Sequence, residues 1–167
     1  MPYFAKHARF FVGIPRLHIT GGEPTLHPYF RGMIPWLREL LQPERMTLQT
    51  NGLRLEQFQK TIKENFDTVF YTEYGDKPST TQTLTQLGVP YSVYEAGGPS
   101  APNFTPRTRR GSGKPCERGF SDTVAYCDGK LYPCCVGPGV EGAVGIEPTE
   151  NWKEEILKVP LPCENCF

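Results

Sequence analysis

Short apolar runs alternate with longer amphipathic segments in the first part of the chain. The runs are rich in β-branched and aromatic residues, which favours strands, and the segments between them carry apolar residues at helical spacing. The predicted strands cover residues 16–20, 45–52, 67–75 and 89–98, and the predicted helices cover 28–43, 54–66 and 79–88. Pro35 lies inside the first of these helices and predicts a kink or a late start.

This alternation predicts an α/β fold with parallel strands. Parallel neighbours need a long crossover connection, and the crossover helix covers the sheet. The fold class predicted for residues 1–96 is therefore a partial (βα) barrel of parallel strands. The carboxyl ends of such strands lie on one rim, where ligand sites of parallel sheets and barrels are found.

The first predicted strand ends in the turn TGGEP, which combines two glycines, a carboxylate and a proline. Gly21 and Gly22 would let the backbone approach a ligand closely, and Glu23 adds a negative charge beside the peptide carbonyls. This set suits a ligand that carries an ammonium group. The alternative is a tight strand-to-helix connection whose acidic residue lies near the positive end of the helix dipole.

The rest of the chain has a different character. Residues 97–115 are rich in Gly, Pro and Ser and predict a linker or a long rim loop. Their four basic residues suit a phosphate or an acidic substrate group, or are simply solvated charge. Residues 116–167 predict a small module with a β-hairpin that turns at Asp128-Gly129 and a short helix over 151–159. The four basic residues of the segment 97–115 are Arg107, Arg109, Arg110 and Lys114.

All six cysteines lie in the last third of the chain, at 116, 127, 134, 135, 163 and 166. Cys163 and Cys166 form a C-x2-C pair, which lets two thiolates bind one metal or one cluster. If the fold brings the C-terminus close to the hairpin, Cys116 and either Cys134 or Cys135 would complete a site of four thiolates with this pair. Zinc and iron-sulfur clusters both fit four thiolates, so spacing alone does not decide between them.

Charge and hydropathy indicate where the protein is located in the cell, but they do not indicate its activity. Eighteen basic and eighteen acidic residues give a net charge of zero, so no global field attracts nucleic acid or an anionic membrane. No apolar run reaches the roughly 18 residues that span a bilayer, and the N-terminus lacks the pattern of a signal peptide. A cytoplasmic location is the expectation.

The phrase LHITGGEPTLHP, followed one βα unit later by TLQTNG, resembles the radical S-adenosylmethionine enzymes. The resemblance implies that Gly21, Gly22 and Glu23 bind the amino group of S-adenosylmethionine and that Pro24 shapes the turn. Asn51 and Gly52 match the turn that this family places after the next strand. The remaining cofactor-binding residue that the resemblance implies is Thr72.

The C-terminal cysteines extend this resemblance. The spacing Cys116-x12-Gly129-x4-Cys134 is similar to the opening of the SPASM and twitch modules, which hold auxiliary 4Fe-4S clusters. One auxiliary 4Fe-4S cluster is therefore expected. Cys127 is interpreted as a packed thiol, and Cys135 as a possible substitute for Cys134. The implied ligands are Cys116, Cys134, Cys163 and Cys166.

The family's C-x3-C-x2-C loop has no counterpart here, because no cysteine precedes Cys116. Three interpretations follow: a fragment, a degenerate member, or a chain whose partner supplies the first strand and cluster. Without that first strand, residues 16–20 form an exposed strand edge, which favours aggregation or pairing with another chain. Whether the chain is an enzyme stays open, as does the substrate, a small molecule or a peptide. His18 is interpreted as a packed strand residue.

The competing hypothesis comes from another class of protein. It is a non-catalytic zinc- or iron-sulfur-binding module on a partial α/β scaffold, which serves as an interaction subunit. Iron content and colour distinguish the two hypotheses.

Overall fold

The computed structural model describes residues 2–74, 78–95, 124–133 and 143–159 of the 167-residue chain. Contacts between residues divide the chain into two compact units. One unit is Phe11–Asn103, and the other combines Met1–Phe10 with Phe104–Phe167. Residues 1–10, which the sequence pattern assigned to the barrel, thus group with the C-terminal part. The predicted boundaries at 97 and 115 fall outside the described residues.

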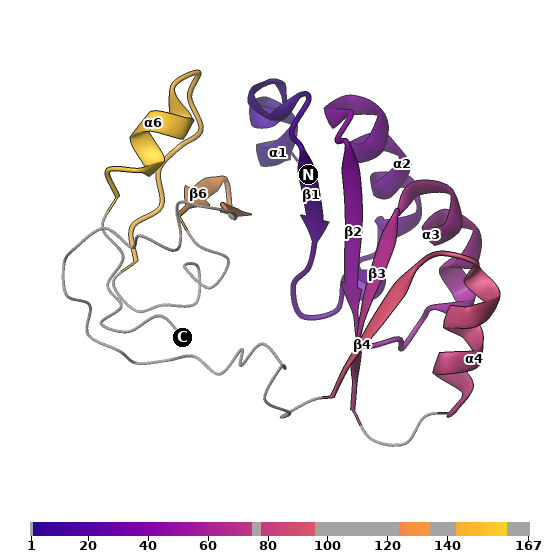
Figure 1. Ribbon diagram of the computed structural model, residues 1–167. Helices are drawn as coiled ribbons and strands as arrows, with labels where there is room; N and C mark the ends of the chain where they lie inside the picture. The colour runs from indigo at the N-terminus through magenta and orange to yellow at the C-terminus, as the bar shows by residue number, and fades with distance from the viewer. Residues whose placement is uncertain (1, 75–77, 96–123, 134–142, 160–167) are drawn as a thin grey trace. The chain divides into compact units, whose positions relative to one another are not determined.

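The first unit contains a four-stranded parallel sheet in the order β1-β2-β3-β4 (Figure 1). The strand order follows the chain order, as expected when each helix crosses over to the neighbouring strand. The predicted α/β class and the four predicted strands are confirmed. The strands are β1 (Arg16–Ile19), β2 (Arg45–Thr50), β3 (Thr68–Glu73) and β4 (Tyr91–Glu95).

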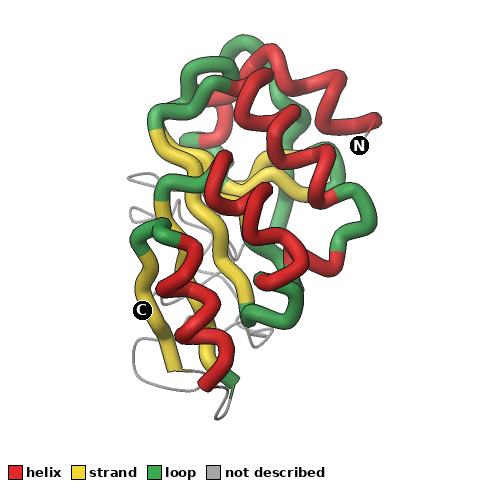
Figure 2. The backbone as a smooth tube through the Cα atoms, turned by 90° about the vertical axis from the view of Figure 1, so that its right-hand side faces the viewer, coloured by secondary structure: helices red, strands yellow, loops and turns green. Residues whose placement is uncertain are grey.

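Helices follow the first three strands and lie on the same face of the sheet (Figures 1 and 2). Pro35 is accommodated inside α2, which begins five residues earlier at Phe30, so a late start is wrong. Gly88 ends α4 with φ +66°, a conformation that glycine adopts easily. The helices are α2 (Phe30–Leu41), α3 (Gln59–Asn65) and α4 (Pro78–Leu87), with short 3₁₀ turns η2 (Pro24–Leu26) and η3 (Glu56–Phe58).

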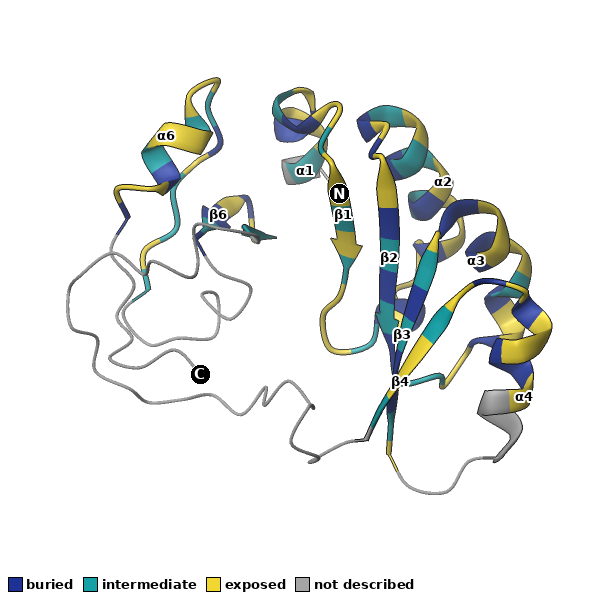
Figure 3. Ribbon diagram, in the orientation of Figure 1, coloured by how far each residue is buried: buried dark blue, intermediate teal, exposed yellow. Residues whose placement is uncertain are grey.

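The core of this unit lies between the sheet and the helices. Phe30 is fully buried at the start of α2, where its ring packs edge-on against Phe58 at 5.0 Å and is stacked with Phe66 at 6.4 Å between centroids. Every second residue of β2 is buried (Figure 3). By contrast, β1 has only half-buried and exposed residues.

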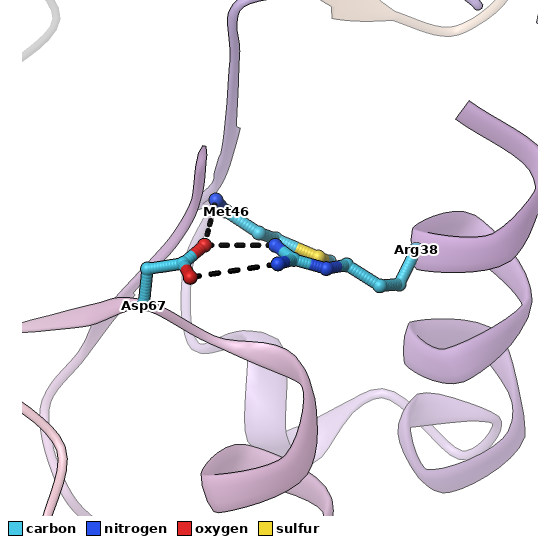
Figure 4. A network of polar contacts seen from close by, with 3 residues as sticks. All are labelled: Arg38, Met46 and Asp67. Atoms are coloured by element: carbon cyan, nitrogen blue, oxygen red, sulfur yellow. Dashed lines mark hydrogen bonds and ion pairs between the residues drawn. The ribbon is translucent and has the colours of Figure 1, made fainter. Parts of the chain in front are cut away.

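An ion pair ties α2 to the two central strands (Figure 4). Arg38 donates from Nη1 to Asp67 Oδ2 at 2.8 Å and from Nη2 to Oδ1 at 3.4 Å. The backbone N–H of Met46 donates to the same Oδ2 at 2.7 Å. The hydrogen bond from Arg38 holds the pKa of Asp67 below 3.8, its ordinary value, although burial acts in the opposite direction.

Among the described strands, β1 lies at the edge of the sheet, as predicted. The backbone N–H of Arg45 donates to Pro15 O, so in the observed register the backbone groups of Arg16 and His18 are directed away from β2. Leu17 and Ile19, on the helix side, are only half-buried, whereas their partners in β2 are fully buried. The edge therefore offers both free backbone groups and apolar side chains.

The C-terminal unit is built on the predicted hairpin, β5 (Ala125–Cys127) and β6 (Lys130–Tyr132). Asp128 and Gly129 have φ of 48° and 82°, as a type I′ turn requires, so the predicted turn is confirmed. Leu131 also exchanges backbone hydrogen bonds with Ile146. A short helix, α6 (Trp152–Ile156), follows.

The N-terminal helix α1 (Pro2–His7) packs within this same unit. The ring of Phe4 meets that of Tyr126 edge-on at 5.1 Å between centroids, and His7 Nδ1 lies 3.1 Å from the Tyr126 hydroxyl. Trp152 donates from Nε1 to Phe10 O at 3.1 Å. Half-buried aromatic residues therefore join the N-terminal segment to the hairpin and to α6. The buried apolar residues described in this unit are aliphatic: Ala8, Leu131, Ile156 and Val159.

In the described part of the chain, no helix has the length and apolar character needed to cross a membrane.

Candidate functional site at the carboxyl ends of β1 and β2

The backbone of Gly21 and Gly22 is exposed directly after β1. Gly21 has φ +144°, a conformation that strains other residues. A Cβ placed on Gly22 would meet no atom within 4 Å. Among the described residues, no protein group forms a hydrogen bond with the carbonyl of either glycine. The turn thus presents free backbone acceptors beside open space.

Glu23 connects this turn to the end of the next strand. Its Oε1 accepts from the Thr25 N–H at 3.0 Å, from the Thr25 hydroxyl at 2.5 Å and from the Thr50 hydroxyl at 2.7 Å. Its Oε2 accepts from the Asn51 N–H at 2.6 Å. Oε1 is therefore saturated by protein donors, whereas Oε2 retains room for one more.

This arrangement changes the role that the sequence suggested for the carboxylate. The residue pattern predicts that the Glu23 carboxylate binds the ligand's ammonium group. In the structure, two of its four hydrogen bonds instead hold Thr25 in the same turn, and the other two join this turn to the end of β2. A cation can still be bound by the backbone carbonyls of Gly21 and Gly22 and by the one free acceptor site of Glu23 Oε2.

The turn after β2 is held in a defined shape. Asn51 accepts from the Leu53 N–H at 3.1 Å through Oδ1, and the Thr50 hydroxyl accepts from the Gly52 N–H at 3.1 Å. Gly52 has φ +81°. The predicted pairing of the GGEP and TNG turns on one rim is confirmed by these contacts, because Asn51 donates directly to Glu23.

Thr72 does not join this network. It lies near the carboxyl end of β3 and is 7% exposed, but it makes no hydrogen bond with Glu23 or Asn51. Pro24 is buried at the start of η2, in agreement with a role in shaping the turn. The assignment of Thr72 to cofactor binding stays a prediction.

Sequence reasoning missed two residues of the site, Thr25 and Thr50. Both are almost fully buried, at 0% and 2% exposure. Thr25 follows Glu23 by two residues, a spacing typical of side-chain capping of a turn, and this signal was available in the sequence. Thr50 carries no such local signal, because its partner is 27 residues away.

The sheet face opposite the helices carries a polar and aromatic row. His18, on β1, is exposed rather than packed, so its predicted packing is wrong. Its Nδ1 lies 2.6 Å from the Thr47 hydroxyl and its Nε2 3.2 Å from Gln49 Oε1. Its ring lies 5.7 Å from that of Phe70, which in turn packs edge-on against Tyr94 at 5.8 Å between centroids.

The implied cluster ligands Cys116, Cys134, Cys163 and Cys166, with Cys135, lie outside the described residues. Elsewhere in the chain, where the structure does describe side chains, no three His, Cys, Asp or Glu residues gather in a metal-binding group. Cys127 is a free, half-buried thiol on β5, in agreement with the predicted packed role. Burial and the neighbouring Asp128 raise the pKa of the Cys127 thiol.

Comparison with known proteins adds no family assignment. No protein-family model matches the chain, and no curated protein matches it significantly.

Proposed function

We propose that the chain binds the amino group of S-adenosylmethionine at the GGEP turn, as part of a radical S-adenosylmethionine-type (βα) barrel. The observation that carries this proposal is the Glu23 network. It holds the Gly21-Gly22 backbone open, exposed and free of protein partners at the carboxyl end of a parallel strand. Ligand sites in parallel α/β folds lie at this position.

The residues present fit the cofactor's amino group. An ammonium needs up to three acceptors, and the free carbonyls of Gly21 and Gly22 together with Glu23 Oε2 supply them. The open space at Gly22 gives the ligand access to these atoms. In the family, this cofactor is the source of a carbon radical, and for the described residues we propose binding and orientation only.

We further propose that the C-terminal unit holds one auxiliary 4Fe-4S cluster on Cys116, Cys134, Cys163 and Cys166. The support is the spacing of the cysteines and the confirmed hairpin between Cys116 and Cys134, which turns where the module pattern requires a glycine. The described core of this unit is small, and a metal staple would stabilise it.

The free edge of β1 supports a third element of the proposal, a partner chain that supplies a neighbouring strand and the radical-generating cluster. Outward backbone groups at Arg16 and His18 would pair with such a strand. Half-buried Leu17 and Ile19 would be covered by its helix. The substrate, a small molecule or a peptide, would then be modified by the assembled barrel.

Equilibrium dialysis of S-adenosylmethionine against the anaerobic full chain tests the first element. Gly22→Ala should weaken binding at least about tenfold, because the methyl group fills the space beside the free carbonyls. Gly32→Ala is the matched control, since a Cβ there also meets no atom but lies within α2. Methylthioadenosine, which lacks the aminobutyrate group of S-adenosylmethionine and therefore its ammonium, should bind Gly22→Ala and wild type equally.

Iron and zinc analysis of anaerobically purified protein tests the second element. We expect brown protein with about four irons per chain and absorption near 400 nm. Cys163→Ala should abolish the colour, and Cys127→Ser should leave it unchanged. Colourless protein with one zinc would instead support the non-catalytic zinc-binding module.

A further inference from the structure

The face of the parallel sheet opposite its helices has a graded chemistry along its strands. Arg16 and Arg45 are paired in register at the amino ends of β1 and β2, so their side chains share this face. His18 and Thr47 form the next row, and Gln49 and Phe70 form the row after that. The face thus runs from cationic to polar to aromatic toward the carboxyl ends.

The two arginines are both exposed and lie directly beside each other. Like charges in directly opposed positions are unfavourable unless an anion lies between them. Arg45 lies near enough to Asp67 to lower the pKa of that carboxyl, whereas Arg16 forms no ion pair with any described residue. No acidic residue shares this face within the strands. The charge of the face is therefore complementary to an anion.

The carboxyl-end rows of the same face carry aromatic side chains. Phe70, on the central strand β3, is half-buried. Its ring sits between those of His18 and Tyr94, and all three are accessible. Planar ligands stack on half-exposed rings of this kind. Arg16 and His18 are two residues apart, about 7 Å along the strand, within reach of one small molecule.

We propose that this face binds a small aromatic carboxylate, with its carboxylate at Arg16 and Arg45 and its ring over His18 and Phe70. The imidazole of His18 is held at both nitrogens, by Thr47 and Gln49, which fixes the ring as a flat surface. Thr20 also donates to Gln49 Oε1 at 3.3 Å and holds the amide in place. This site goes beyond the cofactor site at Glu23 and requires no bound cofactor.

The test is a titration of the full chain with 4-hydroxyphenylacetate, without S-adenosylmethionine, followed by the imidazole NMR signals. The chain has three histidines, His7, His18 and His27, and His18→Gln assigns the relevant signal. We expect the His18 signal to shift and the other two to stay. The neutral 4-hydroxyphenylacetamide should bind at least about fivefold more weakly, because it lacks the charge.

Two variants separate the carboxylate contact from the ring contact. Arg16→Gln should weaken binding of the carboxylate about fivefold. Arg54→Gln, an exposed arginine in the loop after β2, should leave binding unchanged. Phe70→Leu should remove the preference for 4-hydroxyphenylacetate over butyrate.

Equal binding of the amide and the carboxylate would overturn the proposal, as would equal shifts of all three histidines or no effect of Arg16→Gln. Absence of S-adenosylmethionine binding would bear on the cofactor site alone. Loss of the 4-hydroxyphenylacetate response would bear on the sheet face alone, so the two failures are distinguishable.

Discussion

The parallel-sheet unit and the C-terminal unit differ in the interactions that stabilise their folds. The sheet unit buries apolar residues from every helix and from β2 and β3, and many of them are fully inaccessible. The described part of the C-terminal unit has a three-residue hairpin pair, a five-residue helix and aromatic contacts with α1. All six cysteines belong to this second unit.

The difference teaches where each unit's stability should come from. For the sheet unit, burial of apolar area is expected to be the main source of stability. The described part of the C-terminal unit buries few apolar residues, and the unit contains several thiols. Such a unit is expected to depend on metal ligation for much of its folding energy. Each unit contains one tryptophan, Trp36 in α2 and Trp152 in α6, so fluorescence can follow the two separately in single-tryptophan variants.

The largest effect should come from removing the proposed metal. Chelation is expected to unfold the C-terminal unit, because binding free energy at such thiolate sites is folding free energy. Urea denaturation followed by Trp152 in a Trp36→Phe background should then lose its cooperative transition. The Trp36 transition in the Trp152→Phe background should keep its midpoint, and an equal loss in both would contradict the comparison.

Phe30→Ala should have the opposite effect to chelation, because it should destabilise the sheet unit and leave the C-terminal unit unchanged. Removing a fully buried ring that contacts Phe58 and Phe66 should cost about 3 to 5 kcal/mol of unfolding free energy. Urea denaturation should show the loss in the Trp36 transition and not in the Trp152 transition. Tyr29→Ala is the control, since this neighbouring ring is 65% exposed and its removal should change little.

Glu23→Gln should destabilise the sheet unit by about 2 kcal/mol, because charge-assisted hydrogen bonds are lost and an amide N–H2 replaces one acceptor. The loss would appear in the Trp36 transition. Glu39→Gln provides the matched change at an exposed position of α2 and should have almost no effect. A Glu23→Gln variant as stable as wild type would show that the contacts joining the β1 and β2 turns contribute little.

Asp67→Asn should have the smallest effect, about 1 kcal/mol at pH 7, since both partners are partly exposed and solvent screens their attraction. The pKa of Asp67 is lowered in the folded state, so its stabilisation is present above the ordinary value of 3.8. It is lost as the pH falls through the lowered folded-state pKa. Urea midpoints of wild type and variant should therefore differ at pH 7 and converge in acid, and a constant difference would rule out the ion pair as the cause.

Local patterns predicted most of the fold. Alternating apolar runs and amphipathic segments defined the four strands, the three crossover helices and their parallel order, because period and connection length are properties of the chain itself. The Asp128-Gly129 turn was also predictable, since only a few residue pairs adopt two successive positive φ angles easily. The placement of GGEP and TNG on one rim followed directly from the parallel arrangement.

The tertiary structure decided what the side chains at that rim do. The sequence identified Glu23 as chemically notable, but its partners Thr50 and Asn51 lie 27 and 28 residues away and come within reach only when β1 and β2 pair. In the same way, His18 faces Thr47, Gln49 and Phe70 through strand register, and α1 joins the hairpin unit through Tyr126. Such contacts depend on residues far apart in the chain, and no local pattern encodes them.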